Sequence, residues 1–226
     1  MDTSKDYRIL VAEKAAELLE RRVRNWGLSY PLSKRHAVEA EVRELKSLVL
    51  RIKHSYLPLE YLVRDEAITQ LMSRARELAK SLMPPPGWSL KDKDRFGVAE
   101  IRWCLATLYG LKARLLLGPE NYPDYAVDVV AMEVGTVMKH PSNPRLRVTK
   151  AATKTYALTV VTNILNIKEG EVRAVAILPP KVFGGVVSEG MYSSDPLTGY
   201  ELGKRVRRED YNAGEVGAMV EAFLRS

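Results

Sequence analysis

The chain has 226 residues, a length that fits one large domain or two smaller ones. Hydrophobic residues make up 46% and charged residues 28% of the chain, and these proportions exclude a disordered or collagen-like protein. No apolar run approaches the roughly 18–20 residues of a membrane span, and the N-terminus lacks the apolar segment of a secretory signal. We therefore expect a cytoplasmic protein with no membrane partner.

The formal charge of +7 comes almost entirely from the first half of the chain. Residues 1–120 hold 22 lysines and arginines against 16 acids, whereas residues 121–226 hold 13 against 12. A basic surplus of this kind favours a polyanionic partner. The single cysteine, Cys104, excludes an intrachain disulfide, and with three histidines in the chain we expect no zinc site and no other cofactor.

The first half has the three- and four-residue apolar spacing of amphipathic helices. With their capping residues included, the predicted helices span residues 7–26, 33–56, 58–82 and 92–115. Ser33 is the predicted cap of the second helix, and Asp92 or Asp94 of the fourth. Four such helices with short connections predict a small bundle over residues 1–118, and the turn-rich segment 119–125 is a predicted linker.

Five basic residues gather where the first predicted helix turns into the second, with no acid between them in sequence. We call them the corner: Arg21, Arg22, Arg24, Lys34 and Arg35. The corner could follow a phosphate backbone, and a solvated helix surface is an equally good interpretation. The heptad-like seam from Val38 to Tyr56 favours a helical partner.

From Tyr125 the pattern changes to short runs rich in Val, Thr and Ile. The predicted strands cover residues 126–138, 146–152, 156–161, 172–178 and 188–192. Gly135 marks a predicted bulge, and Pro179-Pro180 is predicted to break the chain after the fourth strand. Five short strands in so short a span predict a small closed barrel, because closure removes exposed edges. A final helix follows, capped by Asp210 or Asn212.

Four motifs in this second half occur in a consistent order. They are Asp128 with Val134-Gly135, His140-Pro141, Leu146-Arg147-Val148 and Ser188-Glu189-Gly190-Met191. Together they resemble the OB-fold tRNA-binding domain, which occurs as free-standing tRNA-binding proteins, at the end of methionyl-tRNA synthetases and in synthetase-associated cytokine precursors. The chain departs from this family where Ser142-Asn143-Pro144 replaces Asn-Ala-Asp and where Lys181 alone remains of a basic run.

The resemblance implies an α+β protein of two domains. A helical bundle at 1–118 and a linker at 119–125 would precede a five-stranded OB-fold β-barrel with a C-terminal helix at 126–226. It also implies tRNA as the partner and a homodimer. We expect no enzyme, because the phosphate-loop, dinucleotide-binding, nucleophile-elbow and zinc-protease motifs are missing from the sequence.

Two alternatives stay open. One is a peptide-binding, chaperone-like module of the same barrel family. The other is an accessory subunit that docks on an aminoacyl-tRNA synthetase through the seam from Val38 to Tyr56. Peptide binding that is insensitive to salt would favour the first, and copurification with a synthetase the second.

On an OB barrel the second and third strands and the adjoining loops form the usual polymer-binding surface. The candidate RNA-binding residues there are Lys139, Arg145, Arg147, Lys150, Lys154, Asn163, Lys181 and Ser188. The auxiliary candidates are the corner residues together with Lys204 and Arg205. For the cations a solvated surface is the alternative interpretation, and for Asn163 a turn is equally good.

Overall fold

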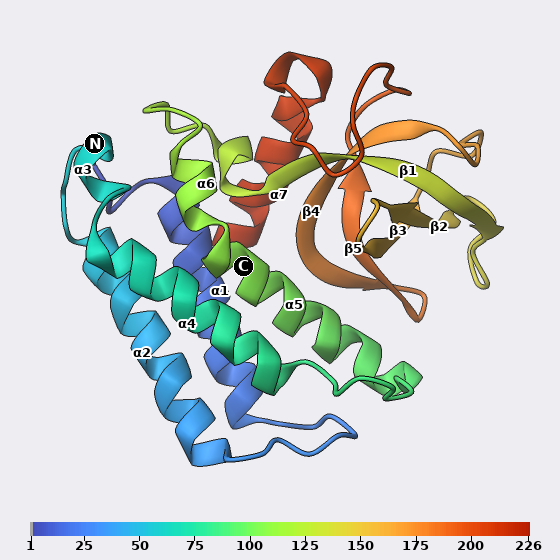
Figure 1. Ribbon diagram of the computed structural model, residues 1–226. Coiled ribbons are helices and arrows are strands. Elements are labelled where there is room, and N and C mark those ends of the chain that lie inside the picture. Colours follow the sequence, from blue (N-terminus) through green and yellow to red (C-terminus); the bar gives the residue numbers. More distant parts are fainter. Residues whose placement is uncertain (1) are drawn as a thin grey trace. The chain divides into compact units, whose positions relative to one another are not determined.

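A computed structural model describes residues 2–226, which form two compact units. The helical unit comprises the residues up to Ala126 together with Leu224–Ser226, and the β unit comprises Val127–Phe223. In Figure 1 the helices before residue 126 run from blue to green, the strands from yellow to orange, and the last helix is red. The predicted order of a helical domain, a five-stranded antiparallel sheet and a C-terminal helix is confirmed.

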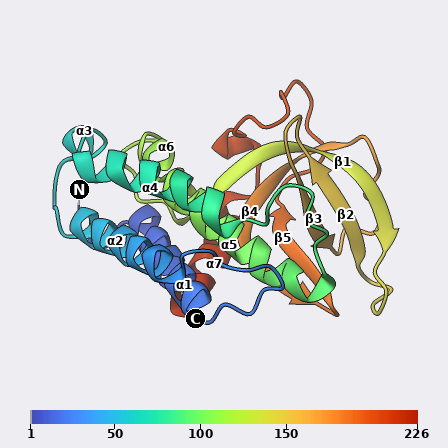
Figure 2. The same cartoon turned by 60° about the horizontal axis from the view of Figure 1, so that its bottom comes forward.

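Six α-helices and two short 3-10 turns make up the helical unit within the described residues. The α-helices are α1 (Tyr7–Arg24), α2 (Arg35–Lys53), α3 (Leu59–Leu62), α4 (Glu66–Leu82), α5 (Arg95–Tyr109) and α6 (Leu111–Leu115), and the 3-10 turns are η1 (Asp92–Asp94) and η2 (Pro123–Ala126). Helix α1 packs against α2 and α5, and α4 packs against the same two helices (Figure 2). Fully buried Ala12, Ala15 and Ala16 allow α1 to approach its neighbours closely.

Three helix boundaries differ from the predictions. The third predicted helix is divided into α3 and α4, because the Asp65 side chain accepts a hydrogen bond from Ala67 N (2.8 Å) and starts a new helix. Ser33 does not cap α2, which begins after Lys34 in the left-handed region. Asp94 does not cap α5 with its side chain, since its carboxylate accepts from Ser29 N (3.0 Å). In the last case a tertiary contact replaces the local one.

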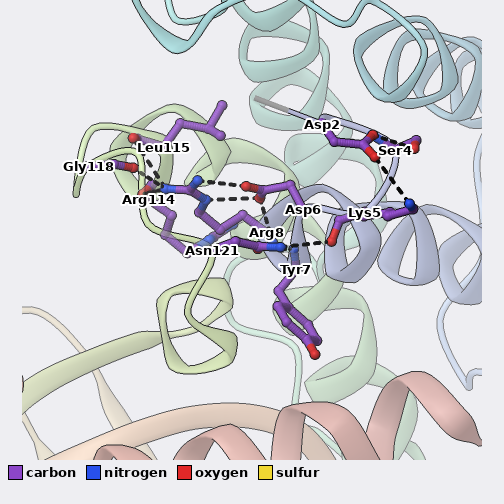
Figure 3. Close-up of polar contacts among 10 residues, drawn as sticks. All are labelled: Asp2, Ser4, Lys5, Asp6, Tyr7, Arg8, Arg114, Leu115, Gly118 and Asn121. Carbon is purple, nitrogen blue, oxygen red and sulfur yellow. Dashed lines mark hydrogen bonds and ion pairs between the residues drawn. The ribbon is translucent and has the colours of Figure 1, made fainter.

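A buried ion pair lies at the start of α1, and its arginine also reaches the chain that follows α6 (Figure 3). Arg8 and Asp6 have side chains that are 0% and 1% exposed, and Arg8 Nη2 lies 2.6 Å from Asp6 Oδ2. Arg8 Nη1 also donates to the carbonyl of Gly118 (2.8 Å). Arg8, one of the 22 basic residues of the first half, is therefore buried in the core and is not available to a ligand.

The segment expected to be a linker, residues 119–125, is held on the helical unit. Asn121 Oδ1 accepts from Tyr7 N (2.9 Å), and its Nδ2 donates to the Lys5 carbonyl (3.0 Å), as Figure 3 shows. The 3-10 turn η2 packs against α1. The change from one unit to the next comes after these contacts, at Ala126.

The β unit is one antiparallel sheet in the order β3-β2-β1-β4-β5, followed by a helix. Its elements are β1 (Asp128–Lys139), β2 (Arg147–Ala152), β3 (Ala157–Thr162), β4 (Val172–Phe183), β5 (Val186–Tyr192) and α7 (Ala213–Arg225). Met132, Val134, Val160, Val175 and Tyr192 pack together inside the curved sheet. Alternate residues of the strands supply this core, as the period of two predicts.

Two local predictions in the sheet have different outcomes. Gly135 does mark a bulge, since the β1–β2 register shifts between Val134 and Thr136. The predicted break at Pro179-Pro180 is wrong, because β4 runs through both prolines. They lie where the β4–β5 register shifts, between Ile177 and Lys181, and a proline's missing N–H costs nothing at such an irregularity.

The predicted closed barrel is also wrong in one respect. The edge strands β3 and β5 lie against each other, yet no backbone ladder joins them within residues 2–226. Side chains bridge the seam instead. Ser188 Oγ accepts from Val161 N (2.9 Å), and Glu189 Oε2 accepts from Thr159 N (3.1 Å). The bridges satisfy edge N–H groups that a backbone partner would otherwise take.

The last helix begins as predicted at one of the two candidate caps. Asn212 Oδ1 accepts from Glu215 N (3.1 Å), so Asn212 and not Asp210 starts α7. None of the helices in residues 2–226 has the length and apolarity that crossing a membrane requires.

Candidate nucleic-acid interface

Two loops meet at one end of the β unit. The imidazole of His140, in the loop after β1, lies 2.8 Å from the carbonyl of Phe183, at the end of β4. Because Ser142 N donates to Nδ1 of His140 (3.2 Å), the ring proton is on Nε2 and is donated to that carbonyl. We call the joined residues 139–147 and 181–185 the rim. His140 therefore has a structural role, because its ring holds the two parts of the rim together.

Gly184 is the residue that permits this approach. It has φ +49°, and a Cβ on it would lie 2.3 Å from Ser142 Oγ and 2.7 Å from His140 Cε1. Gly185, the next residue, has φ +87° and nothing within 4 Å of the same position. Only Gly184 is therefore required by packing as well as by backbone conformation.

The rim brings four of the predicted cations to one end of the sheet: Lys139, Arg145, Arg147 and Lys181. Lys139 and Arg147 are direct cross-strand partners on β1 and β2. Arg147 Nη1 donates to the carbonyls of Pro144 (3.2 Å) and Leu146 (3.1 Å), and no carboxylate pairs with any of the four within residues 2–226. Like charges placed opposite each other disfavour the sheet, and a bound polyanion would relieve this.

Further cations continue onto the face of β2 and β3. Lys150 Nζ donates to Thr159 Oγ1 (2.8 Å) across the two strands. Lys154 lies exposed in the turn between them. Neither has an ion-pair partner in the part of the chain that the structure describes. Lys150 and Lys154 thus place positive charge on the outer side of the strands that OB folds use for polymer binding, whereas Arg147, three positions before Lys150, is on the opposite face of β2.

A simple signal in the sequence marks this surface. Residues 134–168 contain six lysines and arginines and no aspartate or glutamate. We call this stretch the acid-free segment. Counting charge over whole halves of the chain hides it, because all twelve acids of the second half precede or follow this segment. Two of these, Glu169 and Glu189, do reach the segment, where they accept from the backbone N–H groups of Val137 and Thr159.

Two predicted polar residues have different positions. Asn163 is exposed at the end of β3, where a ligand can reach it. Ser188 is only 4% exposed. Its hydroxyl accepts from Val161 N and donates to the Gly190 carbonyl (3.1 Å), so it bridges the strand seam and has no O–H left to donate to RNA.

The basic run before α7 lies away from the rim. Its backbone pairs beside the first half of β1, where Ala131 N donates to the Lys204 carbonyl (2.9 Å). Arg205 pairs with Asp128 (3.4 Å) and donates to the Val127 carbonyl (3.2 Å). Arg205 therefore stabilises the edge of β1, at the end opposite Lys139.

The corner of the helical unit is largely neutralised. Arg22 pairs with Glu100 of α5 (2.6 Å), Arg24 with Glu20 (3.0 Å) and Arg35 with Glu39 (2.9 Å). Arg21 and Lys34 are the corner residues that form no ion pair among the residues described. The corner had no acid between its members in sequence, but the fold supplies acids from elsewhere.

Comparisons with known proteins give one family and one solved structure to report. The family model described as "Alpha helical domain" matches residues 1–118. A solved structure titled "Crystal structure of MetRS related protein from Pyrococcus horikoshii" is 21% identical and has a TM-score of 0.30, with 39% of this chain and 88% of that chain covered. No curated protein matches the chain.

Proposed function

The chain belongs to the alpha helical domain family through residues 1–118, and from this premise we propose that its other part, the β unit, is a partly open OB barrel that binds tRNA without catalysing a reaction. The observation that carries the proposal is the acid-free segment, which places Lys139, Arg145 and Arg147 at the rim and Lys150 on the outer face of β2. The other observations below support it.

The architecture supports an OB assignment. OB folds are five-stranded, partly open barrels that bind polymers on the face of the second and third strands and on the loops after the first and fourth. The β unit has five strands with a seam bridged by side chains. Its unpaired cations occupy that face and those loops, at Lys139, Arg145, Lys150 and Lys181.

The electrostatics support a phosphate backbone as the ligand. Affinity for nucleic acids comes largely from cations that replace the counterions of phosphates, and a cation already paired with a carboxylate contributes less. The rim cations are unpaired, whereas three of the five corner cations are paired. We propose that the rim supplies most of the affinity and that the corner adds a small part through Arg21 and Lys34.

Total tRNA in a filter-binding titration tests the proposal. If four to six phosphates are contacted, log K should fall with log salt concentration at a slope of about 3–5. Binding should be readily measured at low salt and weak at high salt. Failure to bind tRNA at low salt would contradict the proposal.

The partners follow from the resemblance to the tRNA-binding domain. We propose a cytoplasmic homodimer in which two barrels share one RNA, and an aminoacyl-tRNA synthetase as the protein partner. Light scattering on the full chain should give twice the monomer mass of 25.4 kDa. Copurification from source cells should recover a synthetase.

A further inference from the structure

A groove of about 350 Å³ opens in the β unit. It lies between the end of β3, strands β4 and β5, and the helix α7. The side chains that make it apolar are Ile164, Leu178, Phe183, Met191, Met219 and Phe223. Its volume is within the range of small-ligand sites, roughly 300–1,000 Å³, and Lys181 is the one lining residue that the tRNA-binding proposal uses.

A few polar groups interrupt the apolar wall. Asn163 can both donate and accept through its amide, Lys181 donates, and Glu215 accepts. One carboxylate oxygen of Glu215 is already within 3.3 Å of Asn212 Nδ2, and the other stays available for a ligand. Apolar walls with both kinds of hydrogen-bonding group fit a flat ring that has a polar edge.

The groove is continuous with the rim. Leu146 lines the groove and stands between Arg145 and Arg147 in the chain. Thr162, which also lines it, is the direct cross-strand partner of Arg147. A nucleic-acid backbone that contacts the rim cations therefore passes the mouth of the groove.

We propose that the groove receives one unstacked nucleobase of the RNA whose phosphates the rim holds. The inference rests on the proposed function and adds a requirement for an unpaired nucleotide. Phe183 is 40% exposed, so one part of its ring is free to stack on a base. The Asn163, Lys181 and Glu215 side chains would meet the base edge, which is available only where the nucleotide is unpaired.

Two RNAs of equal length test the inference on the full chain by fluorescence anisotropy at one salt concentration. One is a hairpin with an unpaired loop, and the other is a fully paired duplex. The hairpin should bind about 10-fold more tightly than the duplex, since stacking of one base supplies an effect of this order. Both should bind with the same dependence on salt, because the same rim cations hold their phosphates.

Variants of neighbouring residues supply the matched control. Phe183→Ala should remove the 10-fold preference and leave the duplex affinity unchanged. Leu165→Ala, at a residue that follows the groove-lining Ile164, is 51% exposed and does not line the groove itself, should leave both affinities unchanged. Met219→Trp, which fills the groove from α7, should remove the preference as Phe183→Ala does, and circular dichroism verifies that each variant is folded.

Three outcomes would overturn the inference. Equal affinity for the two RNAs, or an equal loss of affinity for both in Phe183→Ala, would show that no base binds in the groove. The proposed RNA binding itself would still stand. An apolar peptide that binds the groove regardless of salt, and does not compete with the hairpin, would assign the groove to a protein ligand. Absence of binding to both RNAs would overturn the proposed function itself, and the inference with it.

Discussion

The helical unit and the β unit carry their cations in opposite ways. Residues 1–120 have 22 basic residues against 16 acids, but many of these cations pair with acids on the same or a neighbouring helix, or lie buried. Residues 121–226 have 13 against 12, but six of the basic residues fall in a segment with no acid. The unit with less net charge therefore has the longer stretch of basic residues that no acid interrupts. Net charge counted over a domain indicates a class of partner without locating the site that binds it.

The two kinds of secondary structure explain much of the difference. In a helix, residues four positions apart are neighbours, so Glu20 can neutralise Arg24 and Glu39 can neutralise Arg35. In the sheet, the neighbours of a cation are on the adjacent strand. There Arg147 faces Lys139, and Lys150 faces Thr159. These three cations of the β unit thus have no carboxylate partner among residues 2–226 and remain open to a ligand.

The largest expected effect is on the free energy of unfolding, and it concerns Arg8, a buried cation of the helical unit. Arg8→Ala should lower the free energy of unfolding by about 3–5 kcal/mol, because Asp6 would stay buried without a partner. Guanidinium unfolding followed by circular dichroism measures this. Arg24→Ala is the control, since its side chain is 70% exposed and its ion pair should contribute little. Equal effects of the two substitutions would contradict a structural role for Arg8.

The next effect compares the rim with the corner directly. Lys139→Gln with Arg145→Gln should weaken tRNA binding at 0.1 M salt by roughly 30-fold or more, because two phosphate contacts are lost. The matched double variant, Arg21→Gln with Lys34→Gln, removes the same charge from the helical unit and should weaken binding only a few-fold. Filter binding of tRNA to both double variants measures the two losses of affinity. A larger loss in the corner variant would reverse the comparison.

A smaller effect is expected from the glycines of the rim. Gly185→Ala should cost about 1–2 kcal/mol of stability, because alanine is disfavoured at its positive φ of +87°. Gly184→Ala should cost more and should also weaken tRNA binding, because its Cβ would push Ser142 and His140 away and separate the two loops. Thermal unfolding and tRNA titration of the pair measure both quantities. Equal RNA affinities for the two variants would show that the joined rim is not needed.

The smallest effect is the acid sensitivity of the helical ion pairs. The hydrogen bond from Lys46 lowers the pKa of Glu20 below its usual 4.5, against the opposing effect of burial. The folded chain then holds this proton less tightly than the unfolded chain. The stabilisation is complete above about pH 4.5 and is lost as the pH falls below it.

Melting temperatures between pH 7 and pH 3 measure this dependence. Glu20→Gln should lower the melting temperature at pH 7 and make the fall toward pH 3 shallower. Glu17→Gln on the same helix is the control, because Glu17 is exposed and should leave the curve unchanged. Identical curves for the parent and Glu20→Gln would rule out a contribution from this pair.

Local patterns predicted most of the fold. The change from three- and four-residue spacing to short Val-rich runs located the two kinds of unit, and Gly135 and Asn212 marked a bulge and a cap. The failures involve contacts between distant residues. Asp94 was expected to cap its own helix but instead accepts from Ser29, and the β3–β5 seam depends on side chains such as Ser188. Spacing along a chain carries no information about such partners.

The candidate site shows the same limit. Lys139, Arg145, Lys150 and Lys181 are exposed, as a binding role requires. The corner looked equally open in sequence, yet Arg22 pairs with Glu100, which lies 78 residues away. The acid-free segment was visible in the sequence, and a short counting window would have found it.

Chemical footprinting of lysines with and without tRNA tests the central claim most directly, because lysines on both units are exposed. Acetylation followed by mass spectrometry should show that tRNA protects Lys139, Lys150 and Lys181 of the β unit. Lys34 of the helical unit should be protected only slightly, and Lys91 of the same unit should react as before. Protection of Lys34 with unchanged reactivity at Lys139 would contradict the account and place the RNA on the helical unit.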